Sequence, residues 1–548
     1  MTLVVPKPKV ASRASRPRRW WFPLSVIGLA LVAMVGLSQV SRFAPDALDR
    51  GMRFTYSFIC AVVALIAAVA WFFFAAGLTR GARLVGAAAL AACVVLVLLA
   101  VRHVEFSGDM VPTFDFRWSP DRLAVLQAHR ARQQAAPQGD VDQATPAATK
   151  AGAAAMSPFD VLEYRGAHRD GVAEGPPLAR DWAAHPPKLV WRQPVGGGYA
   201  SFVVVGPLAI TTEQRGDHEA VVAYDVDTGR ERWVHDYPAH FSETLGGDGP
   251  RATPTVHQEK LYSLGATGVL SCLELAGGRP LWSLNILERN GAANLDWGMA
   301  GSPLVYDNRV LVNPGSQKGS AAARAIIAFD AADGEPLWAA GNAKASYSSP
   351  MLVTLAGLRQ VIIFDAVGLA GHDAADGREL WRTPWKSDFD INAAQPVILT
   401  DDRLLISSAS GAAVIKIAQT DGKWSAGEVW KNRKLKSGYA SPIVYQGHVY
   451  GIDESILACL DVASGKQIWK DRAAQYGHGQ MLLRGDLLVV LAETGELALV
   501  EAMPDGFHEL GRMQAIEGKT WNNPTIVGQR IFVRNHIEMA AYDLPTEP

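Results

Sequence analysis

The sequence predicts an all-β, eight-bladed propeller preceded by three transmembrane α-helices. Three observations lead to this fold class: three long apolar runs near the N-terminus, a recurring motif of an acidic residue, glycine and tryptophan, and a second series of short motifs with eight copies. The copies of the second series lie about 39 to 53 residues apart. A repeat of that length cannot bury a core alone, and such repeats are typical of solenoids and propellers. The 548 residues therefore divide into a membrane region and a repeat region.

The membrane region is predicted at residues 20–102. Its apolar runs cover 20–40, 54–78 and 84–101, and each is about long enough to cross a hydrocarbon core of about 30 Å. A cleavable signal peptide is the alternative for the first run. Two further runs follow it, however, and no clear small-x-small cleavage site is present. We therefore expect a membrane anchor with three transmembrane helices.

The basic residues predict the orientation of this anchor. Residues 1–19 form a basic tail with Lys7, Lys9, Arg13, Arg16, Arg18 and Arg19, the second loop adds Arg80 and Arg83, and the first loop carries Arg42, Arg50 and Arg53. An excess of Lys and Arg marks the cytoplasmic side, so the N-terminus is expected in the cytoplasm. With three crossings, everything after Arg102 then lies in the periplasm or outside the cell. The predicted location is the inner (cytoplasmic) membrane, with the lipid bilayer as the first partner.

Residues 103–157 are predicted to be a short helix and a flexible linker. Ser119 and Pro120 have the residue types of an N-cap and a first-turn proline, ahead of a short apolar pattern that ends at Leu126. From 137 to 157 the chain is mostly Ala, Gln, Gly, Thr and Pro, which is typical of a flexible spacer. The globular part is therefore expected to begin at residue 158.

A docking motif recurs along this globular part. In it, an acidic residue is followed four residues later by glycine and four after that by tryptophan. The acidic side chain can bond the backbone of a tight turn, glycine can supply a positive φ, and tryptophan offers a large flat surface to the next sheet. The predicted structural residues are Trp191, Asp225, Gly229, Trp233, Trp282, Asp330, Gly334, Trp338, Asp373, Gly377, Trp381, Trp430, Asp461, Gly465 and Trp469.

A second series marks the first strand of each repeat. Its copies are Ala200-Ser201, Thr253-Pro254, Ser302-Pro303, Ser349-Pro350, Gln395-Pro396, Ser441-Pro442, Gln480-Met481 and Asn523-Pro524, about 39 to 53 residues apart. This spacing suits four short antiparallel strands, which form one propeller blade. The eighth copy is followed by only three strands, and a lone strand near 189–192 precedes the first copy. We expect this N-terminal strand to close a propeller that spans residues 158–548, because closure removes exposed sheet edges.

These motifs resemble a known family. The docking motif is similar to the tryptophan-docking repeat of pyrroloquinoline-quinone (PQQ)-dependent dehydrogenases and of the propeller lipoprotein of the outer-membrane β-barrel assembly machinery. Closer resemblance is to bacterial membrane-anchored PQQ-like, or PQQ-binding-like, β-propeller repeat proteins, through Tyr164-Arg165-Gly166, Arg169-Asp170-Gly171, Gln214-Arg215-Gly216-Asp217, the run from Gly249 to Thr255, and Gly518-Lys519-Thr520-Trp521. The resemblance implies the propeller fold and leaves the activity open.

A PQQ-dependent membrane-bound dehydrogenase is the alternative function. Such an enzyme needs stacking surfaces, cations for three carboxylates, usually Ca²⁺, and a carboxylate base. Glu213, Asp296 and Asp390 could serve as base or Ca²⁺ ligands, but loop carboxylates are more often simply solvated. Many of these dehydrogenases stack a vicinal Cys-Cys disulfide on PQQ, but no two cysteines are adjacent in this sequence. Cys272 and Cys459 stand in blades predicted to face each other across the ring, so this pair should not form a disulfide either. Little sequence remains for a roof over a cofactor.

We therefore predict no catalytic residue, no metal site and no cofactor, with PQQ and calcium expected only under the dehydrogenase alternative. The formal net charge of -2 provides no basic field for nucleic acid, so no nucleic-acid partner is expected either. The preferred function is a binding or scaffolding module at the cell envelope.

The binding site is predicted on one axial face of the ring, where inter-blade loops converge. Residues three places before each first-strand proline or its equivalent include large polar or aromatic side chains, and others stand nearby. The predicted site residues are Tyr199, Glu213, Arg215, Arg251, Trp297, Tyr347, Asn392, Tyr439, His478, Trp521 and Asn522, with Lys436 close by. Aromatic planes and cations around an axis would suit an envelope protein, peptide or glycan. The alternative is that these side chains only fill the axial channel.

Overall fold

The structure is a computed structural model of the chain, and it describes residues 21–43, 50–135, 157–316, 324–472 and 474–547. The predicted basic tail and the spacer from 137 to 156 lie outside the described residues. The chain divides into two compact units, Met1–Ser119 and Pro120–Pro548.

The first unit contains three long apolar helices, as predicted: α1 (Trp21–Phe43), α2 (Arg50–Ala70) and α3 (Arg80–Ala100). Their candidate spans cover Trp21–Gln39, Gly51–Phe74 and Arg80–Ala100, with mean hydropathy of 2.0, 2.6 and 2.5. By length and composition, each of the three could cross a membrane. A short π-helix, η1 (Trp71–Ala75), continues α2, and Thr79 caps α3 by accepting a hydrogen bond from the Ala82 N–H at 3.3 Å.

Two elements after α3 differ from the expectation of one short helix. A β-hairpin of β1 (Val101–Phe106) and β2 (Pro112–Phe116) follows α3 directly. Helix α4 (Arg122–Ala135) has 14 residues, so it is longer than predicted. Asp121 occupies the capping position instead of Ser119, because its carboxylate accepts from the Ala124 N–H at 2.9 Å.

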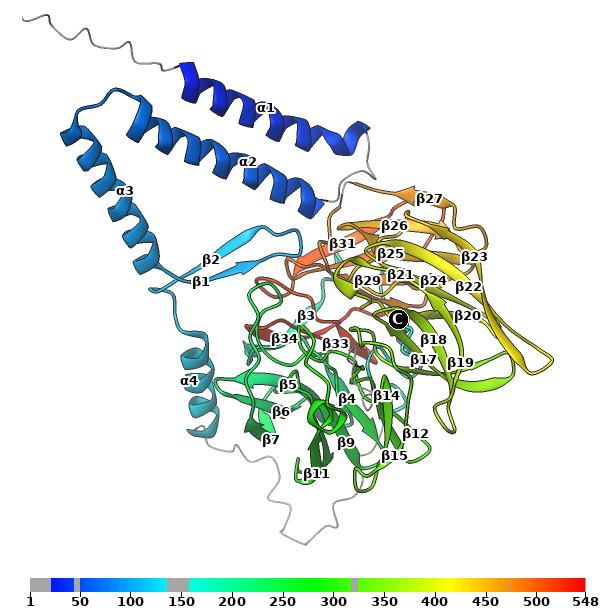
Figure 1. Ribbon diagram of the computed structural model, residues 1–548. Coiled ribbons are helices and arrows are strands. Elements are labelled where there is room, and N and C mark those ends of the chain that lie inside the picture. The colour runs from blue at the N-terminus through cyan, green and yellow to red at the C-terminus, as the bar shows by residue number, and fades with distance from the viewer. Residues whose placement is uncertain (1–20, 44–49, 136–156, 317–323, 473, 548) are drawn as a thin grey trace, which may run out of the picture. The chain divides into compact units, whose positions relative to one another are not determined.

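The second unit contains the predicted eight-bladed propeller. In the described residues, eight antiparallel four-stranded sheets follow one another around the ring in sequence order (Figure 1). Blade 1 consists of β4 (Val203–Val205), β5 (Leu208–Arg215), β6 (His218–Asp225) and β7 (Glu231–Pro238), and blade 2 consists of β8 (Thr255–His257), β9 (Lys260–Leu264), β10 (Val269–Glu274) and β11 (Pro280–Asn285). Blade 3 consists of β12 (Leu304–Tyr306), β13 (Arg309–Val312), β14 (Ile326–Asp330) and β15 (Pro336–Ala340), and blade 4 consists of β16 (Met351–Leu355), β17 (Leu358–Asp365), β18 (Gly368–Asp373) and β19 (Glu379–Pro384).

The second half of the ring is built in the same way. Blades 5 to 7 consist of β20 (Val397–Thr400), β21 (Arg403–Ser408), β22 (Gly411–Thr420) and β23 (Lys423–Asn432); β24 (Ile443–Tyr445), β25 (His448–Asp453), β26 (Ile456–Asp461) and β27 (Gln467–Lys470); and β28 (Gln480–Arg484), β29 (Leu487–Leu491), β30 (Glu496–Glu501) and β31 (Glu509–Gln514). Two short helices, α5 (Ile286–Asn290) and η2 (Asp388–Asp390), lie in inter-blade loops.

Blade 8 joins the two ends of the propeller sequence. Its strands are β32 (Thr525–Val527), β33 (Arg530–Arg534) and β34 (Glu538–Asp543), and β3 (Lys188–Pro194) pairs with β34 as the outer strand. The indole of Trp191 on β3 donates to the Val226 carbonyl in blade 1 at 3.0 Å. The ring is therefore closed by residues from before its first blade.

The recurring tryptophans contact the glycine turn of the next blade. A Cβ added to Gly229 would lie 2.8 Å from the Trp191 ring, and one added to Gly377 would lie 2.4 Å from the Trp338 ring. Both glycines also have positive φ, 68° and 77°. Only glycine combines that backbone conformation with so close an approach, which explains its recurrence at this position. The acidic residue holds the turn: Asp225 accepts from the Thr228 N–H at 2.9 Å.

Trp381 departs from this pattern. Blade 5 replaces the short glycine turn by the long hairpin of β22 and β23, visible in yellow in Figure 1. Trp381 packs inside its own blade, where its indole donates to the Gln360 side chain at 2.7 Å. It is 4% exposed and joins a core cluster that includes Ile415 of blade 5. Because the next blade offers no glycine turn for it to contact, Trp381 packs as a core residue.

The strand-start motifs of blades 1 to 6 are linked by a series of hydrogen bonds around the axis. A backbone N–H of one blade donates to the side chain of the next, from Ser201 to Thr253 at 3.0 Å and from Thr253 to Ser302 at 3.0 Å. The pattern continues from Ser302 to Ser349, from Ser349 to Gln395 and from Gln395 to Ser441. Small hydroxyl and amide residues recur here because each must satisfy a buried N–H of its neighbour.

Candidate functional site

The propeller has two different ends. Strand direction alternates within each blade, so inter-blade connections and second-to-third-strand turns share one end, here called the loop end. The glycine turns and the first-to-second-strand turns share the opposite end, here called the turn end. The predicted binding residues belong to connections and turns of the loop end.

Four rings from four blade connections meet at this end, and we call them the axial aromatic cluster: Tyr199, Tyr439, His478 and Trp521. The Trp521 ring lies 5.5 Å from Tyr199 and is stacked on Tyr439 at 5.9 Å with an interplanar angle of 13°. His478 meets Tyr439 edge-on at 5.0 Å. Residues far apart in the sequence thus form one continuous aromatic surface, of which Tyr439 is 39% exposed.

Charged groups border the cluster. Arg251 lies over the Tyr199 ring at 5.7 Å, and the Lys519 ammonium lies 4.4 Å from the Trp521 centroid. Glu493 accepts from the Trp521 indole N–H at 3.0 Å and from the His478 backbone N–H at 3.0 Å. Cation–π contacts and a bonded carboxylate fix the rings in place. Sequence reasoning missed Lys519 and Glu493 as site residues, although Lys519 stands in a motif that carried the family resemblance.

Arg251 also braces its own loop. Its guanidinium donates to the Gly247 carbonyl at 2.9 Å and the Gly246 carbonyl at 3.1 Å, and lies 4.8 Å from the Phe241 centroid. Burial lowers the pKa of Arg251. The side chain remains charged under physiological conditions, because arginine starts from a very high value.

A second aromatic pair lies beside these residues. Trp297 meets Tyr347 edge-on at 5.8 Å. Burial raises the pKa of the Tyr347 phenol, so this group stays neutral and can donate a hydrogen bond.

Asn392 and Asn522 are buried, with 0% and 1% exposure. The Asn392 amide donates to the Asp365 carbonyl at 2.7 Å, and that of Asn522 donates to the Ala200 carbonyl at 2.8 Å. Lys436, also buried, forms an ion pair with Glu454. These polar side chains support the loops rather than present an open surface.

Glu213 and Arg215 lie away from the aromatic cluster, inside blade 1. Glu213 is 0% exposed and accepts from the Arg215 guanidinium at 2.9 Å and from the Tyr224 hydroxyl. Arg215 also reaches Glu231 at 2.9 Å. Burial alone would raise the pKa of Glu213, but the guanidinium groups of Arg215 and Arg534 hold it below its usual value. The two side chains therefore form a buried ion network, unlike the expected rim of the axial face.

Residues 161–173 enter the axial channel and bond the inner strands; for example, the Val256 N–H donates to the Leu162 carbonyl at 2.7 Å and the Leu483 N–H donates to the Gly171 carbonyl at 2.8 Å. Arg169 donates to the Pro303 carbonyl at 2.7 Å and the Pro350 carbonyl at 2.8 Å, and Arg165 donates to the Met481 carbonyl at 3.2 Å. Both arginines are buried, and we call the pair the arginine plug. The loop-end cluster therefore has a closed floor.

The plug carries backbone strain that its bonds must offset. Both arginines have positive φ, 62° for Arg165 and 54° for Arg169. A Cβ on Gly171 would lie 2.2 Å from the Arg165 guanidinium. In the sequence, these residues pointed only to the family resemblance, and the closeness of the two Arg-containing motifs was the signal for a buried structural element.

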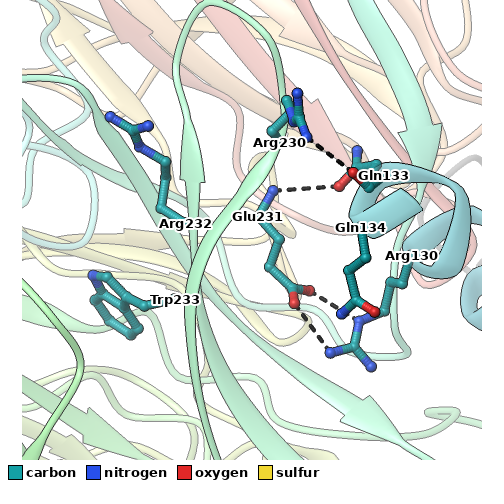
Figure 2. Close-up of a pocket in the computed structure, with 7 residues that line it drawn as sticks. All are labelled: Arg130, Gln133, Gln134, Arg230, Glu231, Arg232 and Trp233. Atoms are coloured by element: carbon teal, nitrogen blue, oxygen red, sulfur yellow. Dashed lines mark hydrogen bonds and ion pairs between the residues drawn. The ribbon is translucent and has the colours of Figure 1, made fainter. Parts of the chain in front are cut away.

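A separate cleft of about 380 Å³ lies between α4 and blade 1, lined by Arg130, Gln133, Gln134, Arg230, Glu231, Arg232 and Trp233 (Figure 2). Its groups are largely bonded to one another. Arg130 binds Glu231 through two hydrogen bonds of 3.0 and 3.1 Å, and Arg230 donates to the Gln133 carbonyl at 2.9 Å. The cleft is therefore best described as a polar clamp that holds α4 on the ring.

The described residues contain no group of three or more His, Cys, Asp or Glu side chains arranged to hold a metal ion. Asp390, one of the carboxylates considered for that role, pairs with Lys344 at 3.1 Å. Cys272 and Cys459 are buried free thiols in blades 2 and 6.

The fold and its docking seams define the class of protein, an eight-bladed β-propeller of tryptophan-docking repeats, and comparison with known proteins agrees. Residues 217–471 match the family of outer membrane protein assembly factor BamB. The resemblance inferred from the sequence motifs is thereby confirmed. No curated protein matches the chain.

Solved structures similar to the chain include quinohemoprotein dehydrogenases and BamB. The quinohemoprotein alcohol dehydrogenase of Comamonas testosteroni has 14% identity and a TM-score of 0.53, with 72% of this chain and 82% of that chain covered. The dehydrogenase ADHIIG of Pseudomonas putida HK5 has 12% identity and a TM-score of 0.50, with 72% and 81% covered. BamB of Moraxella catarrhalis has 14% identity and a TM-score of 0.48, with 66% and 99% covered. At such identities the likeness concerns the fold alone.

Proposed function

We propose that this chain is an extracytoplasmic binding or scaffolding module of the cell envelope, fixed to the inner membrane by α1, α2 and α3, which binds a partner at the loop end of its propeller. The observation that carries the proposal is the axial aromatic cluster. Tyr199, Tyr439 and Trp521 come from three blade connections and contact one another beside Arg251 and Lys519.

The chemistry of this face suits a peptide segment of an envelope protein, or a glycan. Tyrosine and tryptophan combine a large contact area with a polar group, and they are enriched where proteins bind partners. The closed floor adds to this argument, since the arginine plug leaves the loop end as the side from which a ligand reaches the cluster. A partner would therefore bind on the aromatic side chains at the loop end rather than extend through the axis of the propeller.

We further propose that the module works without PQQ, because the loop end does not fit that cofactor. PQQ is flat and carries three carboxylates, so it needs a stacking gap and available cations. The Tyr439 and Trp521 rings stack on each other, and Arg251 already donates to carbonyls of its own loop. The Glu493 carboxylate is held by Trp521 and His478. The purified protein with added PQQ and Ca²⁺ is expected to show no substrate-dependent dye reduction, and such reduction would favour the dehydrogenase instead.

Site-specific photocrosslinking tests the binding face directly. A photoreactive residue placed at Tyr439 should form an adduct with a partner in intact cells. Tyr445 is the matched control, because it lies in the same blade at the other end of β24 and is also partly exposed. Adducts at 445 but not at 439, or equal adducts at both, would contradict binding at the loop end.

Protease accessibility tests the orientation. In spheroplasts, added protease should digest the propeller, because three crossings from a cytoplasmic N-terminus place it outside. Protection in spheroplasts together with cleavage in inverted vesicles would reverse the proposed topology.

A further inference from the structure

The β1–β2 hairpin has one apolar face and one polar face. Val104 pairs with Phe114 and Phe106 pairs with Pro112, while Glu105 pairs with Thr113 on the intervening positions. Because side chains alternate between the two faces of a strand, the first two pairs share one face and the third lies on the other. His103 and Asp115 also pair on the polar side.

Exposed aromatic residues extend the apolar face. Phe114 is 52% exposed and Trp118 is 72% exposed, and Trp118 stacks on Phe116 at 4.7 Å with an interplanar angle of 4°. A two-stranded hairpin is at best marginally stable alone in water. An amphipathic hairpin with exposed aromatic rings therefore indicates a surface that covers one face.

The hairpin begins where α3 ends. Val101 is both the C-cap of α3 and the first residue of β1, and the Arg117 N–H donates to the Ala100 carbonyl at 2.8 Å. Arg102 fixes the same base by donating to the Arg117 and Ser119 carbonyls at 3.0 and 2.7 Å. If α3 crosses the membrane, both ends of the hairpin lie at the level where that helix leaves the hydrocarbon core.

Dimensions favour a hairpin that lies along the membrane. A six-residue strand is about 20 Å long at about 3.3 Å per residue. The interfacial layer on each side of a bilayer is only about 5 to 8 Å thick. A hairpin perpendicular to the membrane would carry Phe114 away from lipid, whereas one lying flat brings its apolar face to the interface, where tryptophan is enriched.

We propose that the β1–β2 hairpin is a membrane-surface element whose Phe114 and Trp118 side chains enter the interfacial layer next to α3. The partner is the lipid surface itself. This inference rests on the proposed membrane anchoring, but it does not depend on binding at the loop end of the propeller.

Depth-dependent quenching in the full-length protein tests this inference. The four native cysteines are replaced by alanine, which already occupies the position of Cys272 and Cys459 in blades 1 and 3. A single cysteine at Phe114 or at Thr113 then carries an environment-sensitive dye. Thr113 is the matched control, because it is the exposed neighbour on the opposite face. The protein is placed in vesicles of phosphatidylcholine and phosphatidylglycerol with nitroxide on the acyl chains near the headgroup.

The dye at 114 should be quenched by nitroxide several-fold more strongly than the dye at 113, while aqueous iodide should quench the dye at 113 more strongly. A second pair, Trp118→Cys and Arg117→Cys, repeats the comparison if a change at Phe114 disturbs the hairpin. Equal nitroxide quenching at both positions would overturn the proposal. A dye at 114 hidden from both quenchers would also overturn it, because protein would then cover the face.

Flotation of the same vesicles distinguishes a failure of the hairpin proposal from a failure of the proposed membrane anchoring. Protein that floats with lipid after alkaline extraction retains its helical anchor, so absent quenching at 114 would then refute the hairpin proposal alone. Protein that does not float would refute the membrane anchoring on which it rests.

Discussion

At the turn end of the ring, neighbouring blades meet through one repeated contact, for example Trp338 on Gly377, whereas at the loop end Tyr199, Tyr439 and Trp521 meet once, around a single axis. The repeated contact solves the same packing problem at every seam where it occurs, and the seam at Trp381 is an exception. The axial contact has no such repetition, because its residues come from unlike loops. The comparison separates side chains that hold the blades together from side chains that occur once, which we propose bind a partner.

Buried and exposed side chains of the propeller should also differ in whether a substitution changes stability or binding. The arginine plug, which lies on the axis between the two ends, is buried and bonds carbonyls of several blades, so it contributes mainly to stability. At the loop end, Tyr439 keeps 39% of its surface exposed. Substitutions in the arginine plug should therefore lower the free energy of unfolding, and those at exposed loop-end rings should act on binding.

The largest effect is expected from Arg169→Ala. The change removes bonds to the carbonyls of Ser302, Pro303 and Pro350 and the ion pair with Glu163, and leaves an unfilled space on the axis. Loss of such a buried group should lower the free energy of unfolding by about 4 kcal/mol. Thermal unfolding of the full-length protein in detergent measures the shift. Arg169→Lys, which keeps the charge but loses the planar fork, should recover only part of the loss.

Trp338→Ala should have the next largest effect. Trp338 lies on Gly377 and its indole N–H has no hydrogen-bond partner among the described residues, so the change removes packing alone. A loss of about 3 kcal/mol is expected, at the lower end for a large aromatic because the ring is only partly buried. The unfolding midpoint reports the loss, and an unchanged midpoint would contradict the inter-blade role of the tryptophan.

The difference between contacts that repeat and contacts that occur once explains how much of the structure could be predicted from the sequence. Trp338 and Gly377 were identifiable because their contact repeats, and repetition is visible in one sequence. Trp381 fits the same motif, yet its position depends on the long β22–β23 hairpin of the next blade, which spacing within its own motif does not reveal. The arginine plug was hidden for a similar reason, since each guanidinium occurs once and its partners are backbone carbonyls of distant blades.

The loop end was predicted in part. Counting back from each strand start placed Tyr439 and Trp521 at the same level of the ring, and the structure brings them into contact. The same count could not show that Glu213 turns into blade 1, because that depends on Tyr224 and Arg215. Whether the axial residues bind a partner stays a prediction. The hairpin after α3 was missed because its strands have only six and five residues and the first of them follows the apolar helix without a break.

A smaller, pH-dependent effect is expected from His372 in blade 4. This side chain is 0% exposed, and its Nδ1 bonds the Gly377 carbonyl at 2.8 Å. Burial lowers the pKa of His372 below its usual value. The folded state therefore binds this proton less readily than the unfolded chain, and stability falls as the pH drops below about 6.5. His372→Gln should make the decrease in unfolding midpoint between neutral and mildly acidic pH shallower, and an unchanged slope would exclude this histidine as a contributor.

The smallest effect on stability is expected at the loop end, from Tyr439→Ala. Tyr439 contributes one face to the stack with Trp521 and an edge contact with His478, but much of its surface is already exposed, so its removal should lower the free energy of unfolding by about 1 kcal/mol. The matched change Tyr445→Ala removes a partly exposed ring from the other end of the same strand, with a hydroxyl that accepts from the Gln446 side chain at 3.0 Å. The two variants should therefore unfold at similar temperatures. They should differ in binding: a photoreactive residue at Lys519, beside the Trp521 ring, should lose its partner adduct in the Tyr439→Ala background and keep it in the Tyr445→Ala background. A large drop in midpoint for Tyr439→Ala with the adduct intact would mean that the axial rings hold the fold together, as the turn end does, and that the two ends differ less in function than in sequence.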